Sequence, residues 1–192
     1  MAYNTYKEDI GQAVEVLKRG GVILYPTDTV WGIGCDATNS AAVRRVYDIK
    51  RRDDSKALIT LVGSVAALER VVDKVPDVGY ELLDAAVDPI TIVYDKGVGV
   101  APELLASDGS IGVRVTSETF SRQLCDALRR PLVSTSANVS GCPSPVFFNE
   151  ISPEIIAAVD YVCTSRRDDT TPRRPSCVIR LSENGMFKIL RK

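Results

Sequence analysis

A run of small polar side chains is the densest set of hydrogen-bonding groups in the sequence. Ser134-Thr135-Ser136-Ala137-Asn138-Val139-Ser140-Gly141 follows Leu132-Val133, a short apolar stretch that predicts a strand. Small side chains let backbone N–H groups approach an anion closely, as they do in phosphate-binding nests. We therefore expect an anion site here, and a polar loop whose hydroxyls cap the next element is the alternative.

A second group of candidate residues consists of cations at the end of a predicted helix. Lys50-Arg51-Arg52 closes a helical pattern, and Lys56 follows within the next turn. Arginine offers a planar fork and lysine a point charge, and phosphate oxygens accept from both. We expect Lys50, Arg52 and Lys56 to converge on a phosphate-bearing ligand. The alternative is that these cations only meet the negative end of the helix dipole, for ~0.3–1 kcal/mol each.

Two predicted strands carry further candidates. Pro26-Thr27-Asp28-Thr29-Val30-Trp31-Gly32 follows the buried strand Val22–Tyr25, and ligands often bind where such strands end. The alternative is an Asx-type turn in which Asp28 and Thr27 satisfy local amides. Arg114 alternates with valines in its strand, so it lies on the face opposite to theirs. It is expected either to pair with a substrate carboxylate or to be solvated.

The residues that are missing exclude several mechanisms. There is no histidine, which excludes Ser-His-Asp and Cys-His catalysis and any metal site that needs imidazole. The 5 cysteines are an odd number without a C-x-x-C pair, which argues against a disulfide framework and a structural zinc site. We expect no metal site built from protein ligands. The chemistry then falls to lysine, arginine, carboxylates, hydroxyls, backbone donors and Mg²⁺.

A glycine pattern offers a further alternative. Gly32-x-Gly34-x-x-Ala37 is similar to a dinucleotide-binding fingerprint, with Asp53 or Asp54 as the partner of the ribose. That fingerprint needs a glycine turn immediately after the strand. Here the predicted strand ends at Pro26, well before the first glycine, so we keep this interpretation only as an alternative.

Length and composition predict one globular domain. The chain has 192 residues, 45% of them hydrophobic and 26% charged, and its net charge is −1. We expect a single domain over residues 1–192 with a core at about 10–191. No apolar run reaches the ~20 residues that span a bilayer, and the N-terminus lacks the pattern of a secretion signal. A cytoplasmic location without membrane contact is expected.

Helical and strand patterns alternate along the chain, which predicts an α/β fold. An antiparallel pair at the C-terminal end, joined through Asn184-Gly185, makes the twisted sheet mixed, with helices flanking it. The expected helices lie at 10–17, from 39 or 40 to 50, at 65–72, 76–86 and 117–129. The expected strands lie at 22–25, 57–62, 90–94, 111–115, 132–133, 161–163, 177–181 and 186–190.

Several of these stretches occur in the order found in one known family. In that order, the sequence resembles the YrdC/TsaC family of threonylcarbamoyl-AMP synthases over roughly residues 10–191. The matching motifs are Pro26–Gly32, Lys50-x-Arg52, Gly112-Val113-Arg114-Val115, Ser136-x-Asn138 and Pro175-Ser176-Cys177-Val178-Ile179. The resemblance is to the single-domain type of the family.

The resemblance implies the condensation of L-threonine, bicarbonate or CO₂, and ATP. The amine of threonine first becomes a carbamate, and a carbamate oxygen then attacks the α-phosphorus of ATP. The products are threonylcarbamoyl-AMP and pyrophosphate, and Mg²⁺ bridges phosphate oxygens. A partner threonylcarbamoyl-transferase complex then modifies adenosine in tRNA.

The resemblance also implies roles for individual residues. The catalytic signature corresponds to Lys50, Arg52, Ser136 and Asn138. The nucleotide is expected to contact Lys50, Arg52, Lys56, Ser110, Ser136, Asn138, Ser144 and Arg191. Threonine is expected to contact Thr29, Arg114, Ser134 and Ser176, with Arg114 on its carboxylate.

The sequence departs from the family pattern, and two other functions stay open. Asp53 stands where proline is usual, and Leu61 stands where several relatives have histidine near threonine. One alternative function is a tRNA- or double-stranded-RNA-binding module without turnover. The other is a carbamoyl-transfer domain of the hydrogenase-maturation type. The charged segment 166–174 is expected to be a solvated loop, with a lid over the site as the alternative.

Overall fold

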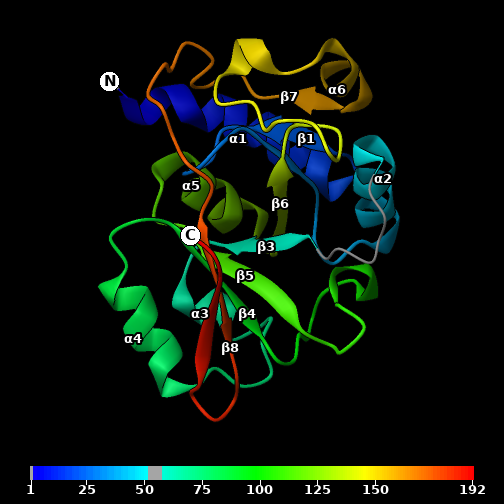
Figure 1. Ribbon diagram of the computed structural model, residues 1–192. Coiled ribbons are helices and arrows are strands. Elements are labelled where there is room, and N and C mark those ends of the chain that lie inside the picture. Colours follow the sequence, from blue (N-terminus) through cyan, green and yellow to red (C-terminus); the bar gives the residue numbers. More distant parts are fainter. Residues whose placement is uncertain (1, 52–57) are drawn as a thin grey trace.

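The computed structural model describes residues 2–51 and 58–192 and contains one sheet of 9 strands in the order β7-β1-β2-β6-β3-β5-β4-β8-β9. Figure 1 shows this sheet running through the molecule with helices on both sides. The strands are β1 Ile23–Tyr25, β2 Gly32–Gly34, β3 Ile59–Val62, β4 Ile90–Tyr94, β5 Ile111–Val115, β6 Leu132–Ser136, β7 Tyr161–Val162, β8 Cys177–Leu181 and β9 Phe187–Arg191.

The sheet is mixed, as the sequence predicts. The pairs β1–β7, β3–β5 and β4–β8 are parallel, and the other neighbours are antiparallel. The register places Leu61 of β3 opposite Arg114 of β5. On the other edge of β3, Ile59 lies opposite Ser134 of β6. Arg114 and Ser134 are therefore carried by two strands that both pair with β3.

Three apolar clusters attach the helices to the sheet (Figure 1). Helices α1 and α5 pack together against β1, β3 and β6, while α2 and α6 cover another face of the β1–β2–β6 region. The short α3 and the longer α4 pack near β4, β5 and β8. The helices are α1 Ala2–Lys18, α2 Ser40–Lys50, α3 Val65–Leu68, α4 Asp77–Ala85, α5 Thr119–Leu128 and α6 Pro153–Ala158, with short 3₁₀ turns at Pro102–Leu104 and Phe148–Glu150.

Local signals place several boundaries as predicted. Asn39 caps α2, because its side chain accepts from the backbone N–H of Ala42, and the helix ends at Lys50. Glu118 caps α5 by accepting from the first-turn amides of Phe120 and Ser121. At the C-terminal hairpin, Gly185 has φ +85°, the left-handed conformation that glycine adopts at least cost.

Some predictions of elements were wrong, each for a local reason. The glycines of Gly32-x-Gly34 form the antiparallel strand β2 and not a strand-to-helix turn, so the dinucleotide fingerprint is excluded. A Cβ on Gly34 would lie 2.7 Å from the carbonyl oxygen of Val133 and 2.7 Å from Cε1 of Tyr25, so only glycine allows this approach. The predicted helix at 65–72 ends at Leu68, since Val72 bridges to Gly97. Helix α6 was not predicted.

Candidate active site

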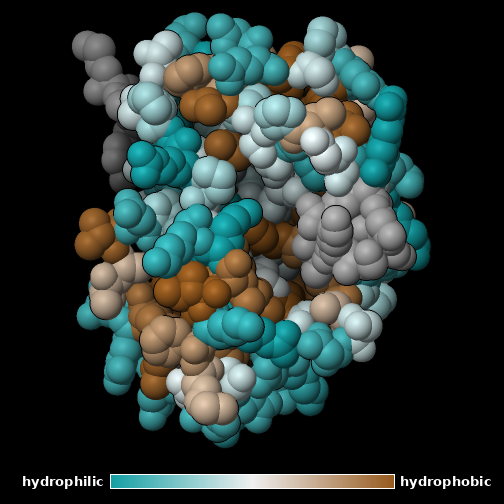
Figure 2. All heavy atoms as spheres, viewed as in Figure 1, coloured by the Kyte–Doolittle hydropathy of each residue, from teal (hydrophilic) through white to brown (hydrophobic). Residues whose placement is uncertain are grey.

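A cavity of about 360 Å³ opens between β2, β4, β5 and β6 and the segment that leads into β8. Figure 2 shows the hollow near the centre of this face of the molecule. Eight of the predicted binding residues line it, although they come from distant parts of the chain: Thr29, Ser110, Arg114, Ser134, Ser136, Ser144, Ser176 and Arg191. The expectation that these positions form one site is consistent with this geometry.

The cavity has two walls that differ in burial. The buried wall consists of Thr29, Arg114, Ser134 and Ser176, each at most 5% exposed. The open wall consists of Ser136, Ser144 and Arg191, which are half-buried or exposed. A polar ligand in the cavity would therefore meet a fixed hydroxyl-and-guanidinium surface on one side and adjustable side chains on the other.

Arg114 is the central charge of the buried wall. Its guanidinium donates to the hydroxyl of Thr29 at 3.2 Å and to the hydroxyl of Ser134 at 3.3 Å. Asp28 lies 3.6 Å away and supplies the opposite charge that a buried guanidinium needs. Among the described residues, Nε of Arg114 has no hydrogen-bond partner. Arg114 is thus buried rather than solvated, and its side chain lines the cavity.

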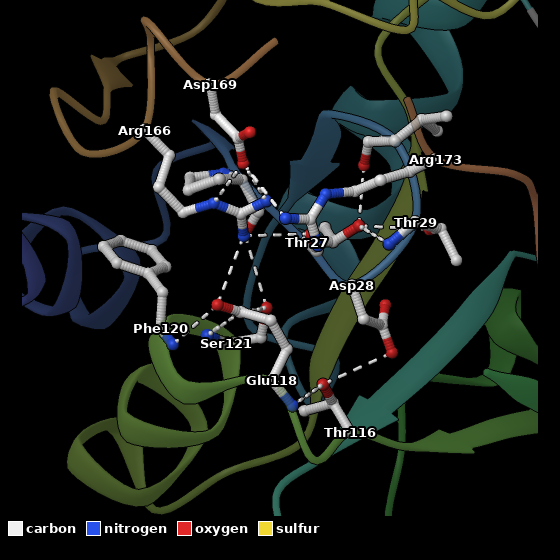
Figure 3. Close-up of polar contacts among 12 residues, drawn as sticks. Thr27, Asp28, Thr29, Thr116, Glu118, Phe120, Ser121, Arg166, Asp169 and Arg173 are labelled. Carbon is white, nitrogen blue, oxygen red and sulfur yellow. Dashed lines mark hydrogen bonds and ion pairs between the residues drawn. The ribbon is translucent and has the colours of Figure 1, made fainter. Parts of the chain in front are cut away.

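The loop between β1 and β2 holds Thr29 in place through its own threonines (Figure 3). The hydroxyl of Thr27 donates to the carbonyl of Val30 at 2.6 Å and accepts from the backbone N–H of Thr29 at 3.0 Å. Asp28 turns away from these local amides toward Arg114, and it accepts from the hydroxyl of Thr116 at 3.4 Å. The alternative of a turn in which Asp28 and Thr27 satisfy local amides is therefore confirmed for Thr27 and wrong for Asp28.

Ser176 of the buried wall is held by a hydroxyl that sequence reasoning missed. The hydroxyls of Thr91 and Ser176 lie 2.8 Å apart, and both residues are buried. The carbonyl of Ser176 accepts from Nη2 of Arg191 at 2.9 Å. Thr91 was noted only as part of the predicted strand 90–94. Its inward direction follows from strand alternation once the cavity side of β4 is known.

Lys50 lies behind the open wall and does not line the cavity. Its ammonium donates to the carbonyl of Ser136 at 2.5 Å and to the carbonyl of Asn138 at 2.7 Å. The amide nitrogen of Asn138 donates to the carbonyls of Val139 and Cys142. In this structure Lys50 and Asn138 therefore hold the end of β6 at Ser136 and the loop after it, which carries Ser144.

Ser110 lines the cavity, and it also belongs to a network of charged side chains at the edge of the cavity. Its hydroxyl accepts from Arg180 at 3.3 Å, and Arg180 also pairs with Asp95 and Asp108. The Ser110 hydroxyl and N–H, followed by Arg180, lower the pKa of Asp108 to about 2.

Some expected site residues are not part of this geometry. Arg52, Lys56 and Asp53 lie outside the described residues, so their predicted roles stay predictions. Leu61 is fully buried in the cluster beneath α1 and α5 and does not line the cavity, although it lies in register with Arg114.

The structure also bears on metal and membrane expectations. Over residues 2–51 and 58–192, no group of three or more His, Cys, Asp or Glu side chains is arranged to hold a metal ion. None of the helices in that part of the chain is both long and apolar enough to cross a membrane.

The fold and the cavity together define a class of protein. It is an α/β protein with a mixed sheet and a polar cavity. A buried arginine and several hydroxyls line this cavity and are suited to hydrogen-bond an anionic ligand. The model of the Sua5/YciO/YrdC family, described as "Telomere recombination", matches residues 15–192. The chain belongs to this family.

Named relatives and solved structures support the assignment. The threonylcarbamoyl-AMP synthase of Xanthomonas euvesicatoria pv. vesicatoria is 35% identical over 157 residues, covering 80% of this chain and 84% of that protein. The crystal structure of E. coli YciO matches with a TM-score of 0.82 and 27% identity, over 95% of this chain and 88% of YciO. P. abyssi Sua5, crystallised with L-threonine, matches with a TM-score of 0.78 and 25% identity, over 90% of this chain. The chain spans 50% of that Sua5 chain.

Proposed function

We propose that this protein is an L-threonylcarbamoyladenylate synthase. The observation that carries the proposal is the buried wall, where the Arg114 guanidinium lines the cavity together with the hydroxyl residues Thr29, Ser134 and Ser176. A small hydroxylated amino acid fits this surface, because its carboxylate takes the guanidinium and its own hydroxyl finds serine and threonine partners. A relative of known structure binds L-threonine, which supports the same ligand here.

The proposed reaction has two steps. The neutral amine of L-threonine attacks the carbon of CO₂ and releases a proton, or it condenses with bicarbonate and releases water; either route gives the carbamate anion. A carbamate oxygen then attacks the α-phosphorus of ATP, and the bond from that phosphorus to the oxygen bridging to the β-phosphorus breaks. Threonylcarbamoyl-AMP and pyrophosphate result, and no histidine base is needed once the carbamate has formed.

The chain's own contribution is positioning and charge stabilisation, which dominate such phosphorus-centred reactions. Arg114 orients the amino acid from the buried wall. Ser136, Ser144 and Arg191 face the cavity from the open wall and are suited to phosphate oxygens. Lys50 and Asn138 hold the end of β6 at Ser136 and the loop that carries Ser144. By family correspondence, Arg52 and Lys56 are proposed to contact the phosphates as well.

Mg²⁺ is proposed to enter as part of the nucleotide substrate. The described residues provide no cluster of metal ligands, and Mg²⁺ usually keeps several waters and binds through phosphates. A threonylcarbamoyl-transferase complex and tRNA are proposed as downstream partners, with the cytoplasm as the compartment where they meet.

The test is pyrophosphate release from Mg·ATP, with L-threonine and bicarbonate added separately and together. We expect release only when both are present, and little with L-serine or with carbamoyl phosphate. Release that depends on carbamoyl phosphate would instead indicate carbamoyl transfer. Salt-sensitive tRNA binding without any release would indicate an RNA-binding module.

A further inference from the structure

Arg166 connects three segments beside the buried wall (Figure 3). Its guanidinium donates to the carbonyl of Thr27 at 3.1 Å and pairs with Glu118 at 3.2 Å. Its Nε and Nη2 also bond Asp169, at 3.2 Å and 3.0 Å. The side chain is only 13% exposed. The expectation of a solvated loop at 166–174 is therefore wrong at this residue.

The backbone of Arg166 indicates that this arrangement is specified rather than incidental. Its φ is +60°, in the left-handed region that residues with a side chain rarely adopt. Such a conformation persists only where the surroundings determine it. The contacts of Arg166 with Thr27, Glu118 and Asp169 fix its backbone in this conformation.

Each partner of Arg166 is itself held firmly. Glu118 caps α5 by accepting from the N–H groups of Phe120 and Ser121 and from the hydroxyl of Ser121. Asp169 accepts from Arg173 at 3.0 Å, two residues before the segment Pro175–Ser176 that lines the cavity. The N–H and hydroxyl of Thr171, then Arg166, keep the pKa of Asp169 well below its usual range, so its charge is permanent at working pH.

The neighbouring Arg167 packs on an aromatic ring that touches the other end of the loop. Its guanidinium lies 4.9 Å from the centre of the Phe148 ring, and that ring packs 4.9 Å from the ring of Trp31. Arg167 also donates to the carbonyls of Val162 and Cys163. Of the two consecutive arginines, Arg166 therefore contacts the loop that carries Thr29 directly, and Arg167 reaches it through Phe148.

We propose that Arg166, held by Asp169 and Glu118, is a positioning residue that fixes the Thr27–Thr29 loop and thereby sets the affinity for the amino-acid substrate. The identity of that substrate rests on the proposed function. The path is short: Arg166 holds the Thr27 carbonyl, the hydroxyl of Thr27 holds the Thr29 amide, and the hydroxyl of Thr29 accepts from Arg114. No group on this path lies on the open wall, so nucleotide affinity is expected to be independent of it.

Arg166→Gln tests the proposal, and Arg45→Gln is the matched control. Arg45 also donates to an aspartate, Asp160, and to a backbone carbonyl, that of Ala158, but it does not line the cavity. Trp31 is the chain's only tryptophan and lies at the end of the loop, so its fluorescence reports loop order without any ligand. Threonine and ATP dissociation constants are measured in parallel.

In Arg166→Gln we expect acrylamide to quench Trp31 more strongly and threonine to bind about tenfold to a hundredfold more weakly, the loss typical of a displaced binding group. ATP affinity should stay within about twofold. Arg166→Lys should recover only part of the threonine affinity, because an ammonium lacks the fork that reaches three partners. If Arg166→Gln does not fold, Asp169→Asn replaces it.

The proposal would be overturned if Arg166→Gln showed the same Trp31 quenching and the same threonine affinity as Arg45→Gln. It would also be overturned if Arg166→Gln lost affinity for threonine and for ATP equally. If Trp31 quenching rises but the unaltered protein neither binds threonine nor releases pyrophosphate, the positioning of the loop stands and the proposed synthase function fails.

Discussion

The two walls of the cavity are built in different ways. On the buried wall, Arg114 and its neighbours are locked by hydroxyls, an opposite charge and strand register before any ligand arrives. On the open wall, Ser136 is the last residue of β6, and Ser144 lies in the loop that follows, whose backbone accepts from Lys50 at the carbonyl of Asn138. A preformed binding surface loses little conformational entropy when a small ligand binds, and it can therefore discriminate between similar ligands. A less ordered surface loses more conformational entropy, because its side chains become ordered on binding. We therefore expect the buried wall to select the amino acid and the open wall to bind phosphate.

Replacing Arg114 is expected to have the largest effect on this difference between the two walls. In Arg114→Ala, the KM for threonine should rise at least a hundredfold, while the KM for ATP changes less than about threefold. The loss also leaves Asp28 buried without its cation, which costs about 3–5 kcal/mol of unfolding free energy. Steady-state kinetics and urea denaturation measure the two effects.

Adding Asp28→Asn to Arg114→Ala separates stability from recognition. The double variant removes the stranded charge, so we expect most of the stability to return while threonine binding stays weak. Equal increases of both KM values in the single variant would show that Arg114 does not recognise the carboxylate.

Removing the lysine behind the open wall should have the next largest effect. Lys50→Met removes the ammonium that donates to the carbonyls of Ser136 and Asn138, and among the described residues only the Ser136 carbonyl keeps another donor, the N–H of Asn138. The unfolding free energy should fall by about 1–3 kcal/mol. The KM for ATP should rise more than that for threonine, the reverse of Arg114→Ala.

Lys96→Met is the control for Lys50→Met, since Lys96 pairs with Asp73 at the surface, where an ion pair contributes about 0–1 kcal/mol. Unfolding free energies are compared by urea denaturation. A loss in Lys50→Met no larger than that in Lys96→Met would mean that the carbonyl contacts do not support the open wall.

The contrast between the walls also explains what the sequence could predict. The family resemblance predicted eight residues that line the cavity, because its motifs recur in the same order along this sequence. The contacts of Arg166 with Thr27 and Glu118 could not be predicted in this way, since these residues come from distant segments and meet only through tertiary packing. The role of Asp28 was missed for the same reason, because its partner Arg114 lies on another strand.

Removing one hydroxyl should weaken the buried wall only slightly. Thr91→Val deletes the partner of the Ser176 hydroxyl while keeping the shape of the side chain. One neutral hydrogen bond contributes about 0.5–1.5 kcal/mol, so the KM for threonine should rise about twofold to tenfold.

Thr60→Val on β3, which is separated from β4 by β5, is the matched control for Thr91→Val. The hydroxyl of Thr60 is buried and has no partner among the described residues. Its loss should leave the kinetics unchanged and stability equal or higher, because an unsatisfied polar group is removed. If both variants raise the KM equally, the Thr91–Ser176 contact has no specific role.

The smallest effect is expected at the edge of the cavity, from Asp108. Contacts with Ser110, then Arg180, lower its pKa from 3.8 to about 2 in the folded protein. A carboxyl whose folded pKa is depressed stabilises the protein above its unfolded pKa, and that stabilisation disappears as the pH falls through the folded pKa. The Tm advantage over Asp108→Asn should therefore be constant above about pH 5 and shrink between about pH 4 and pH 2. Because the side chain is 53% exposed, solvent screens this pair and the advantage should be small. A Tm difference that does not change with pH would show that Asp108 acts by shape and not by charge, and the edge of the cavity would then depend on packing as the buried wall does.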